Sequence, residues 1–266
     1  MSERYTHGHF GTVVDNHATR TAANSAAFLL PHLKSTDTLL DIGCGPGSIS
    51  IDLAGQVASL VGIDAAAEAI ARAEEDRRQR GVANASFRVA DVYDLPFEDG
   101  MFDVVYGHQL LQHLADPVAA LVEARRVLAP GGLIAVRDAD YGTMVHDPPE
   151  PALDRWLALY HEVARHNGGE PDAGRLLSGW VAQAGFTDIV ATTSTWTYSA
   201  PEAIEGWRKL WTSRLLEARL GRAAVEYGMA TPRELEELAA GWDRWAEQPR
   251  PFFAFLHGEV LARKPD

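Results

Sequence analysis

The stretch LLDIGCGPGSISIDLA, residues 39–54, decides the fold. An apolar run ends in an acid, three glycines follow within residues 43–47, and a segment of helical character comes next. Glycine tolerates positive φ and has no side chain, so a turn of this kind lets a ligand approach the main chain closely. We therefore expect residues 43–47 to form a binding turn between a buried strand and a helix.

Strand and helix patterns alternate around this turn from residue 38 to residue 140. Parallel strands joined by helical crossovers form an open doubly wound sheet, which makes the fold class α/β. The predicted strands are TLLDIG (38–43), SLVGID (59–64), ASFRVAD (85–91), FDVVYGH (102–108) and GGLIAVRDAD (131–140).

Outside this region the pattern becomes mainly helical. A helix that ends near Pro31 is expected in TRTAANSAAFLLPHL (19–33), and a strand is expected over TDIVATTSTWTY (187–198). Capping-box pairs, Ser199 with Glu202 and Thr231 with Glu234, each predict the start of a further helix. One predicted face carries Ile204, Trp207, Trp211 and Leu215, and the other carries Leu235, Leu238, Trp242 and Trp245. FFAFLHGEVLARK (252–264) is expected to close the chain as a strand.

Composition narrows the class of partner. The formal net charge of -13 repels phosphate backbones, so we do not expect nucleic acid as a partner. We find no apolar run long enough for a membrane span, and MSERYTHGHF lacks the apolar core of a signal peptide, so a cytoplasmic location is expected. The single cysteine, Cys44, is expected to be a small filler.

The spacing of the glycines bears on the ligand. A dinucleotide fingerprint starting at Gly43 would need a glycine where Ser48 stands, and Pro46 interrupts the turn. This favours a ligand other than a pyrophosphate. Asp64 ends the second strand at the distance expected of a carboxylate that accepts hydrogen bonds from ribose hydroxyls. Asp91, beside the backbone of Val92, is placed to accept from an adenine amine.

Four motifs in order carry a family resemblance: LLDIGCGPG, VGID, ADVYDLPFEDGMFDVVYGHQLLQHLADP and ARRVLAPGGLIAV. They resemble the class I S-adenosylmethionine-dependent methyltransferases, and most closely the subgroup that acts in ubiquinone and menaquinone biosynthesis. The resemblance implies a Rossmann-like, seven-stranded sheet of order 3-2-1-4-5-7-6 with an antiparallel seventh strand. In addition to this sheet, we expect a helical lid at the N-terminus and a helical insertion before the last strand.

The expected organisation is one domain, 1–266, in four sections. They are a lid (1–34), a cofactor-binding core (35–140), substrate-side helices with the insertion (141–250) and the closing strand (251–266). The resemblance places Gly43, Gly45 and Gly47 under S-adenosylmethionine, Asp64 with Ala65 at the ribose, Asp91 with Val92 at the adenine, and Gly107 with His108 near the transferred methyl. As part of the lid, we expect Tyr5, His17 and Arg20 to reach the cofactor.

Methyl transfer from a sulfonium depends mainly on alignment, so a base is optional. His108 and His113 are our candidates for a base. Asp138, Asp140 and Tyr141 are placed to orient a substrate or to bind a divalent metal, but the metal-dependent members of the family use a different arrangement. Our catalytic set is therefore His108, His113 and Asp140. We expect no metal, and the pair His7 and His9 lacks a third ligand.

The sequence thus predicts a methyltransferase that acts on a small, fairly hydrophobic molecule such as a natural product or a quinone, at O, N or C. Two alternatives stay open. One is an enzyme that keeps the cofactor but catalyses a cyclisation or rearrangement, and the other is a nicotinamide-dependent oxidoreductase on the same fold. A homodimer through the insertion is compatible with the sequence.

Overall fold

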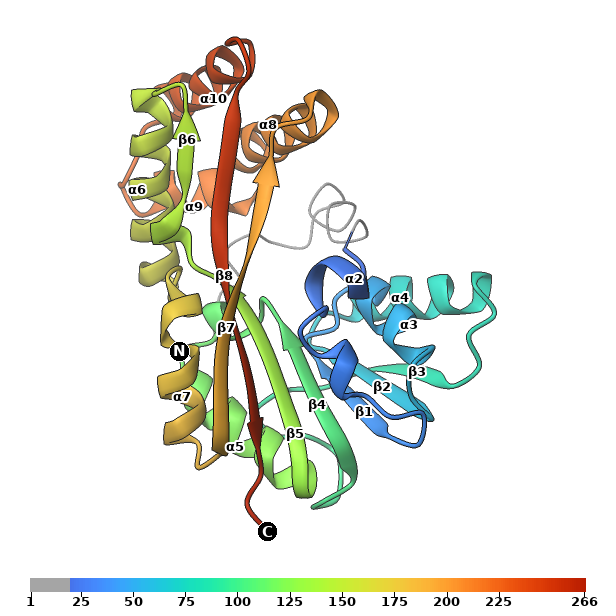
Figure 1. The fold of residues 1–266 in the computed structure, drawn as a ribbon. Helices are drawn as coiled ribbons and strands as arrows, with labels where there is room; N and C mark the ends of the chain where they lie inside the picture. The colour runs from blue at the N-terminus through green and yellow to red at the C-terminus, as the bar shows by residue number, and fades with distance from the viewer. Residues whose placement is uncertain (1–19) are drawn as a thin grey trace.

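The computed structural model describes residues 20–266, and these contain one mixed sheet of eight strands (Figure 1). The order is β3-β2-β1-β4-β5-β8-β6, and β7 pairs with β8. β1 to β5 are parallel, whereas β8 runs antiparallel to β5, β6 and β7. The strands are β1 (Thr38–Ile42), β2 (Ser59–Asp64), β3 (Ala85–Val89), β4 (Phe102–His108), β5 (Leu128–Ala139), β6 (Val145–Asp147), β7 (Thr187–Tyr198) and β8 (Phe252–Arg263).

The seven longer strands confirm the predicted order. β8 is the closing strand and lies antiparallel between β5 and β7, in the slot expected for the seventh strand. The short strand β6 was not predicted, because three residues are too few to show an alternating pattern.

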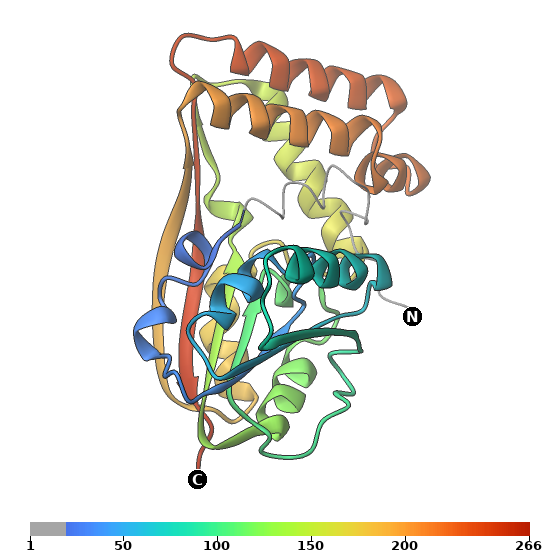
Figure 2. The same ribbon diagram turned by 90° about the vertical axis from the view of Figure 1, so that its right-hand side faces the viewer.

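Helices cover both faces of the sheet and form a separate group above it (Figures 1 and 2). None of the helices within residues 20–266 combines the length and apolar character needed to span a bilayer. The helices are α2 (Ala22–Ser25), α3 (Ser48–Ala54), α4 (Ala67–Gln79), α5 (Pro117–Val127), α6 (Pro151–His166), α7 (Leu177–Gln183), α8 (Pro201–Leu216), α9 (Arg219–Glu226) and α10 (Pro232–Ala246). Short 3-10 turns are η1 (Leu30–His32), η2 (Leu111–His113), η3 (Tyr141–Thr143) and η4 (Ala173–Leu176).

The helix expected over residues 19–33 is wrong in its extent. α2 ends at Ser25, and only the turn η1 follows before β1. Two tertiary donors take carbonyls that a longer helix would use: Trp196 Nε1 donates to the Asn24 carbonyl at 3.2 Å and Tyr106 Oη to the Ser25 carbonyl at 2.9 Å. These contacts tie α2 to β4 and β7 instead of allowing the helix to continue.

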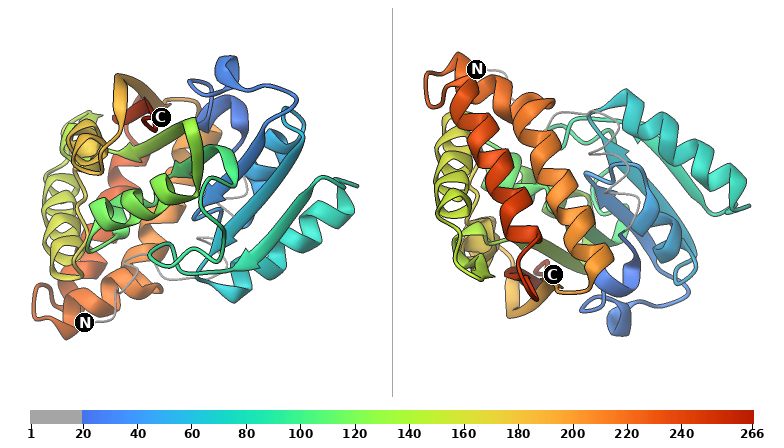
Figure 3. Two further views of the ribbon diagram at one scale, coloured as in Figure 1. Left: turned by 90° about the horizontal axis from the view of Figure 1, so that it is seen from below. Right: turned by 90° about the horizontal axis from the view of Figure 1, so that it is seen from above.

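The upper group, α6 and α8 to α10, surrounds a core rich in tryptophan. Both predicted apolar faces are buried: Ile204, Trp207, Trp211 and Leu215 on α8, and Leu235, Leu238, Trp242 and Trp245 on α10. Thr231 caps α10 as expected, whereas α8 begins after Ala200 and Ser199 makes no capping hydrogen bond. Seen from above, α8 lies between α10 and the half of the molecule that contains α3 and α4 (Figure 3).

Candidate active site

The three glycines after β1 all have positive φ, but their surroundings differ. A Cβ on Gly43 would lie 2.9 Å from Leu110, and a Cβ on Gly47 would lie 2.8 Å from the Cβ of Ala73 on α4. A Cβ on Gly45 would meet no described atom within 4 Å. Gly43 and Gly47 therefore serve close packing, while Gly45 presents bare backbone to open space.

Asp64 joins this turn to the next helix. Its Oδ2 accepts a hydrogen bond from the Gly45 N–H at 3.0 Å, and its Oδ1 accepts from the Ala66 N–H at 2.8 Å, across Ala65. A carboxylate has about four lone-pair sites, so acceptor capacity remains on both oxygens. The acid is placed both to hold the turn and to receive hydroxyl groups of a ligand.

Two groups beneath the turn are structural. Asp41 is buried and accepts from Ser50 Oγ at 2.5 Å, and burial together with the nearby Asp64 charge raises the pKa of Asp41 to about 7. Burial also raises the pKa of the Cys44 thiol well above its ordinary value. A thiol with a raised pKa carries little thiolate, so Cys44 is not suited to act as a nucleophile.

Asp91 follows β3 at the same edge of the sheet. The carboxylate is exposed and accepts from the Tyr93 N–H at 2.9 Å, while Val92 is buried in the core. The Ala90 N–H donates to the Asp64 carbonyl at 3.2 Å, which ties the ends of β2 and β3 together. Gly45, Asp64 and Asp91 thus follow one continuous edge across β1, β2 and β3.

At the end of β4 the chain turns sharply through Gln109, which has a φ of +50°. The side chain of Gln109 accepts from Arg20 Nη2 at 2.9 Å through Oε1, and its Nε2 lies 2.8 Å from His257 Nε2. Because the amide nitrogen can only donate, His257 accepts through Nε2. Sequence reasoning missed Gln109 and His257; the position of Gln109 directly after a central strand was the available signal.

His108 lies beside this chain of hydrogen bonds, among aromatic rings. Its ring centroid is 6.0 Å from Trp196, 6.4 Å from His257 and 6.5 Å from Tyr106. Burial and the charges of Arg137 and Arg20 lower the pKa of His257 well below its ordinary value. The edge near β4 is therefore aromatic, with a neutral imidazole at its base.

Beneath His257 lies a buried ion pair that the sequence did not predict. Arg137 Nε is 3.1 Å from Glu259 Oε1, and Ser194 Oγ bonds to both side chains. The guanidinium of Arg137 also lies 5.0 Å from the Trp196 ring centroid. Burial lowers the pKa of Arg137. The pair supports the aromatic edge from below.

The second candidate base, His113, is in η2, directly after the β4 edge. Burial and the positive charges of Arg214 and Arg20 lower its pKa to about 3. His113 is therefore neutral at physiological pH, which suits it to accept a hydrogen bond but makes it a weak proton acceptor. Asp138 holds η2 in place, since its Oδ1 accepts from the Gln112 N–H at 3.1 Å.

Asp140 is used differently from the expectation. Its two carboxylate oxygens bond to Arg175 Nη2 at 2.6 Å and to Arg175 Nε at 2.7 Å, and the Arg175 backbone N–H donates to it as well. This bidentate pair fixes η4 against β5 and occupies the carboxylate. We therefore do not retain Asp140 as a catalytic candidate. Tyr141 stacks on Tyr160 at 4.3 Å within the core of the upper helices.

Arg20 lies beside the end of β4: its Nη2 donates to Gln109 Oε1 at 2.9 Å, and its Cζ is 5.4 Å from the Trp196 ring centroid. Tyr5, His7, His9 and His17, which the sequence analysis considered, lie outside the described residues. Residues 20–266 contain no group of three or more His, Cys, Asp or Glu side chains placed to hold a metal ion.

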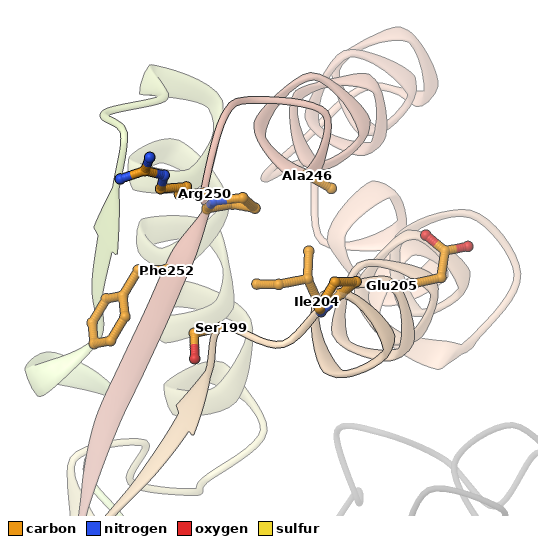
Figure 4. Close-up of a pocket in the computed structure, with 8 residues that line it drawn as sticks. Ser199, Ile204, Glu205, Ala246, Arg250 and Phe252 are labelled. Carbon is orange, nitrogen blue, oxygen red and sulfur yellow. The ribbon is translucent and has the colours of Figure 1, made fainter.

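A cavity of about 640 Å³ lies elsewhere, at the beginning of α8 and β8 (Figure 4). Figure 4 shows the Glu205 carboxylate and the Arg250 guanidinium pointing to opposite sides of it. It brings together no set of groups suited to catalysis. Its lining residues are Ser199, Pro201, Ile204, Glu205, Ala246, Arg250, Pro251 and Phe252.

Comparison with known proteins agrees with this geometry. A family model described as a methyltransferase domain matches residues 33–193. An uncharacterized methyltransferase of Schizosaccharomyces pombe is 34% identical over 275 residues, which covers 98% of this chain and 97% of the relative.

Solved structures share the fold. A Bacillus subtilis protein superposes with a TM-score of 0.59 at 18% identity, covering 90% of this chain and 97% of its own. A phosphoethanolamine N-methyltransferase of Haemonchus contortus, solved with S-adenosylhomocysteine, gives a TM-score of 0.57 at 19% identity, covering 91% of this chain and 52% of its own. The family match and the full-length relative show that this chain belongs to the methyltransferase family.

Proposed function

We propose that this methyltransferase transfers the methyl group of S-adenosylmethionine to a small, fairly hydrophobic acceptor. When bound, the cofactor supplies an electrophilic methyl group on its sulfonium sulfur, and S-adenosylhomocysteine is the good leaving group. The observation that carries the proposal is the continuous edge of the sheet on which Gly45, Asp64 and Asp91 lie beside His108.

The residues present fit the cofactor. Open space over Gly45 allows a ligand to approach the backbone, where any side chain would intrude. Asp64 keeps acceptor capacity for ribose hydroxyls, with Ala65 beside it, and the exposed carboxylate of Asp91 is available to an exocyclic amine. We assign these residues, with the backbone of Val92, to the nucleoside half, and Gly107 with His108 to the methyl end.

On the acceptor side, the chain offers aromatic surface and neutral polar groups. His108, Trp196 and His257 pack together, and His113 is held neutral nearby. Such a setting excludes water and orients an apolar ring system, which is most of what methyl transfer requires. These features, with the quinone-like resemblance of the motifs, favour a phenol or quinol acceptor. The division into a cofactor half (35–140) and a substrate half (141–250) belongs to this proposal.

The alternatives from the sequence fare differently. Membership of the methyltransferase family argues against a nicotinamide-dependent oxidoreductase. A cyclase that only holds the cofactor would bind it through the same residues as a methyltransferase. Analysis of the product therefore distinguishes the two functions, whereas a binding measurement does not. We also propose that the protein does not act on nucleic acid. A homodimer formed through the upper helices is a further part of the proposal.

Calorimetry tests the cofactor half. The wild type is expected to bind S-adenosylhomocysteine, and Asp64→Ala is expected to weaken binding roughly 10-fold or more, because charge-assisted hydrogen bonds to the ribose are lost. Asp99→Ala removes an exposed carboxylate that pairs with Arg126 and serves as the control. Equal affinities in all three proteins would refute the assignment of this pocket.

A further inference from the structure

One buried arginine of the upper helices forms no ion pair within the described residues, 20–266. Arg214, in the last turn of α8, is 4% exposed. Within residues 20–266 its guanidinium forms no ion pair, and its buried Nε has no hydrogen-bond partner. Arg137, the other buried arginine in the described part of the chain, is paired with Glu259. A buried charge without a counterion is costly, which makes Arg214 exceptional in this structure.

The guanidinium of Arg214 is held in a defined way. Its Cζ lies 4.6 Å from the ring centroid of Trp211, one turn earlier on α8. An arginine stacked on an aromatic face keeps its N–H donors at the edge of the plane, where they can form a paired set of hydrogen bonds. Carboxylates and phosphates are the groups that match this arrangement.

Arg214 is also close to the candidate active site. Trp211 packs against Tyr141 with 6.4 Å between ring centroids, and Tyr141 follows directly on the carboxyl end of β5. Burial is the largest cause of the lowered pKa of His113 on η2, and the charge of Arg214 is the next. Burial raises the pKa of Tyr198 at the end of β7, and the charge of Arg214 partly offsets this rise. From α8, Arg214 thus acts on η2 and on the end of β7, both of which belong to the surroundings of the candidate site.

We propose that Arg214 binds an oxyanion, a carboxylate or a phosphate, carried by the methyl acceptor. This inference rests on the proposed methyl transfer and specifies its substrate class: an aromatic or otherwise apolar molecule with one acidic group. The cofactor also carries a carboxylate, but the residues assigned to the cofactor lie along β1 to β4, where Arg20 already supplies a cation beside Gln109. An acidic group on the acceptor would satisfy the guanidinium and set the distance from α8 to the transferred methyl.

The first test uses the wild type alone. Purified protein is incubated with methyl-labelled S-adenosylmethionine and a small-molecule extract of the organism that carries this chain, and the labelled product is applied to an anion exchanger at pH 8. The product is expected to bind the exchanger. Loss of binding after phosphatase treatment identifies a phosphate, and resistance to phosphatase identifies a carboxylate. A labelled product that flows through overturns the inference while leaving methyl transfer intact.

Absence of any labelled product, from protein that binds S-adenosylhomocysteine, counts instead against methyl transfer itself and removes the inference with it. The two failures are therefore distinguishable. Because this test needs no variant, it does not depend on how well a substituted protein folds.

The second test uses Arg214→Met, which keeps the stem but removes the charge, and Arg214→Lys, which keeps the charge but not the fork. With the purified acceptor, Arg214→Met is expected to raise KM about 10- to 100-fold, and Arg214→Lys less. The dissociation constant of S-adenosylhomocysteine should stay within about twofold of the wild-type value, because substitutions far from a site change it little. Lys209→Met, which removes an exposed charge from the same helix, is the control.

Stability gives a readout that a structural role would not produce. Removing an unpaired buried charge is expected to leave the Tm of the ligand-free protein unchanged or higher in Arg214→Met. A lower Tm with an unchanged KM would make Arg214 a packing residue and overturn the proposal. Weakened binding of S-adenosylhomocysteine would assign Arg214 to the cofactor carboxylate, and would also overturn it.

Discussion

The backbone N–H of Gly45 donates to Oδ2 of Asp64 at 3.0 Å, so the residue with the barest backbone in the turn is tied directly to the acid that ends the next strand. A single hydrogen bond thus positions two elements of the proposed cofactor site relative to each other. Because the other oxygen of Asp64 caps the start of α4 through Ala66, displacement of the acid would loosen both the turn and the helix.

Substitutions of two glycines in the turn are expected to affect different properties, stability at Gly47 and cofactor affinity at Gly45. Gly47→Ala places a Cβ 2.8 Å from Ala73 at a φ of +81°, and should lower the free energy of unfolding by about 2–4 kcal/mol. Gly45→Ala meets open space, so only the backbone cost of about 1–2 kcal/mol applies, but its methyl would occupy ligand space. Urea unfolding and calorimetry with S-adenosylhomocysteine measure the two effects. If the loss of affinity for S-adenosylhomocysteine followed the loss of stability in the same proportion in both variants, this separation would be contradicted.

Gln109 is expected to act through its side chain. Gln109→Gly keeps the φ of +50° accessible while removing the hydrogen bonds to Arg20 and His257. We expect kcat to fall about 5- to 10-fold, the equivalent of about one lost hydrogen bond, with little change in cofactor affinity. Steady-state kinetics at saturating cofactor measure the effect. Wild-type kcat in this variant would show that the chain of hydrogen bonds does not position the site.

The buried pair of Arg137 and Glu259 should be sensitive to the loss of one partner. Glu259→Gln leaves the guanidinium of Arg137 uncompensated and is expected to cost about 3–5 kcal/mol of stability. Replacing both residues by methionine should cost less, because no buried charge remains. Denaturant unfolding of the single and double variants decides the matter, and a double variant less stable than the single one would argue against an electrostatic cause.

Asp138 gives a prediction in pH. Burial raises its pKa to about 7, from an ordinary value near 3.8, and its Oδ2 has no hydrogen-bond partner in the part of the chain that the structure describes. The folded state therefore holds the proton more tightly than the unfolded state, and the stabilising contribution of this group falls as pH rises from about 4 to about 7.

We accordingly expect Asp138→Asn, whose side-chain oxygen can still accept from Gln112, to gain stability relative to wild type as pH rises over that interval. Unfolding at pH 4.5, 6 and 8, with Asp99→Asn as the control, measures the difference. A difference that is constant with pH would mean that Asp138 does not titrate in this range.

The sequence was sufficient for the parts of the fold that depend on local pattern. Alternating strands and helices predict the parallel, doubly wound sheet, and the family resemblance supplies its strand order. The apolar positions on α8 and α10 predict their buried faces, because periodicity follows directly from burial. It failed where a distant group decides the local structure. α2 stops at Ser25 because Tyr106 and Trp196 reach its carbonyls from other strands.

The candidate site shows the same division. Gly45 and Asp64 could be identified from spacing, since both lie within one unit of strand, turn, helix and strand. The pairings of Asp140 with Arg175, Gln109 with His257 and Arg137 with Glu259 join positions far apart in the chain. No local pattern predicts such contacts, so only the structure showed the residues that line the proposed acceptor side.

The claim that this chain moves a methyl group is tested by the stoichiometry of its reaction. Incubation with labelled S-adenosylmethionine and an acceptor fraction should yield labelled product and S-adenosylhomocysteine in equal amounts, with both abolished in heat-treated protein. Conversion of an acceptor without release of S-adenosylhomocysteine would contradict the claim, and would identify the bound cofactor as a structural element of a different reaction.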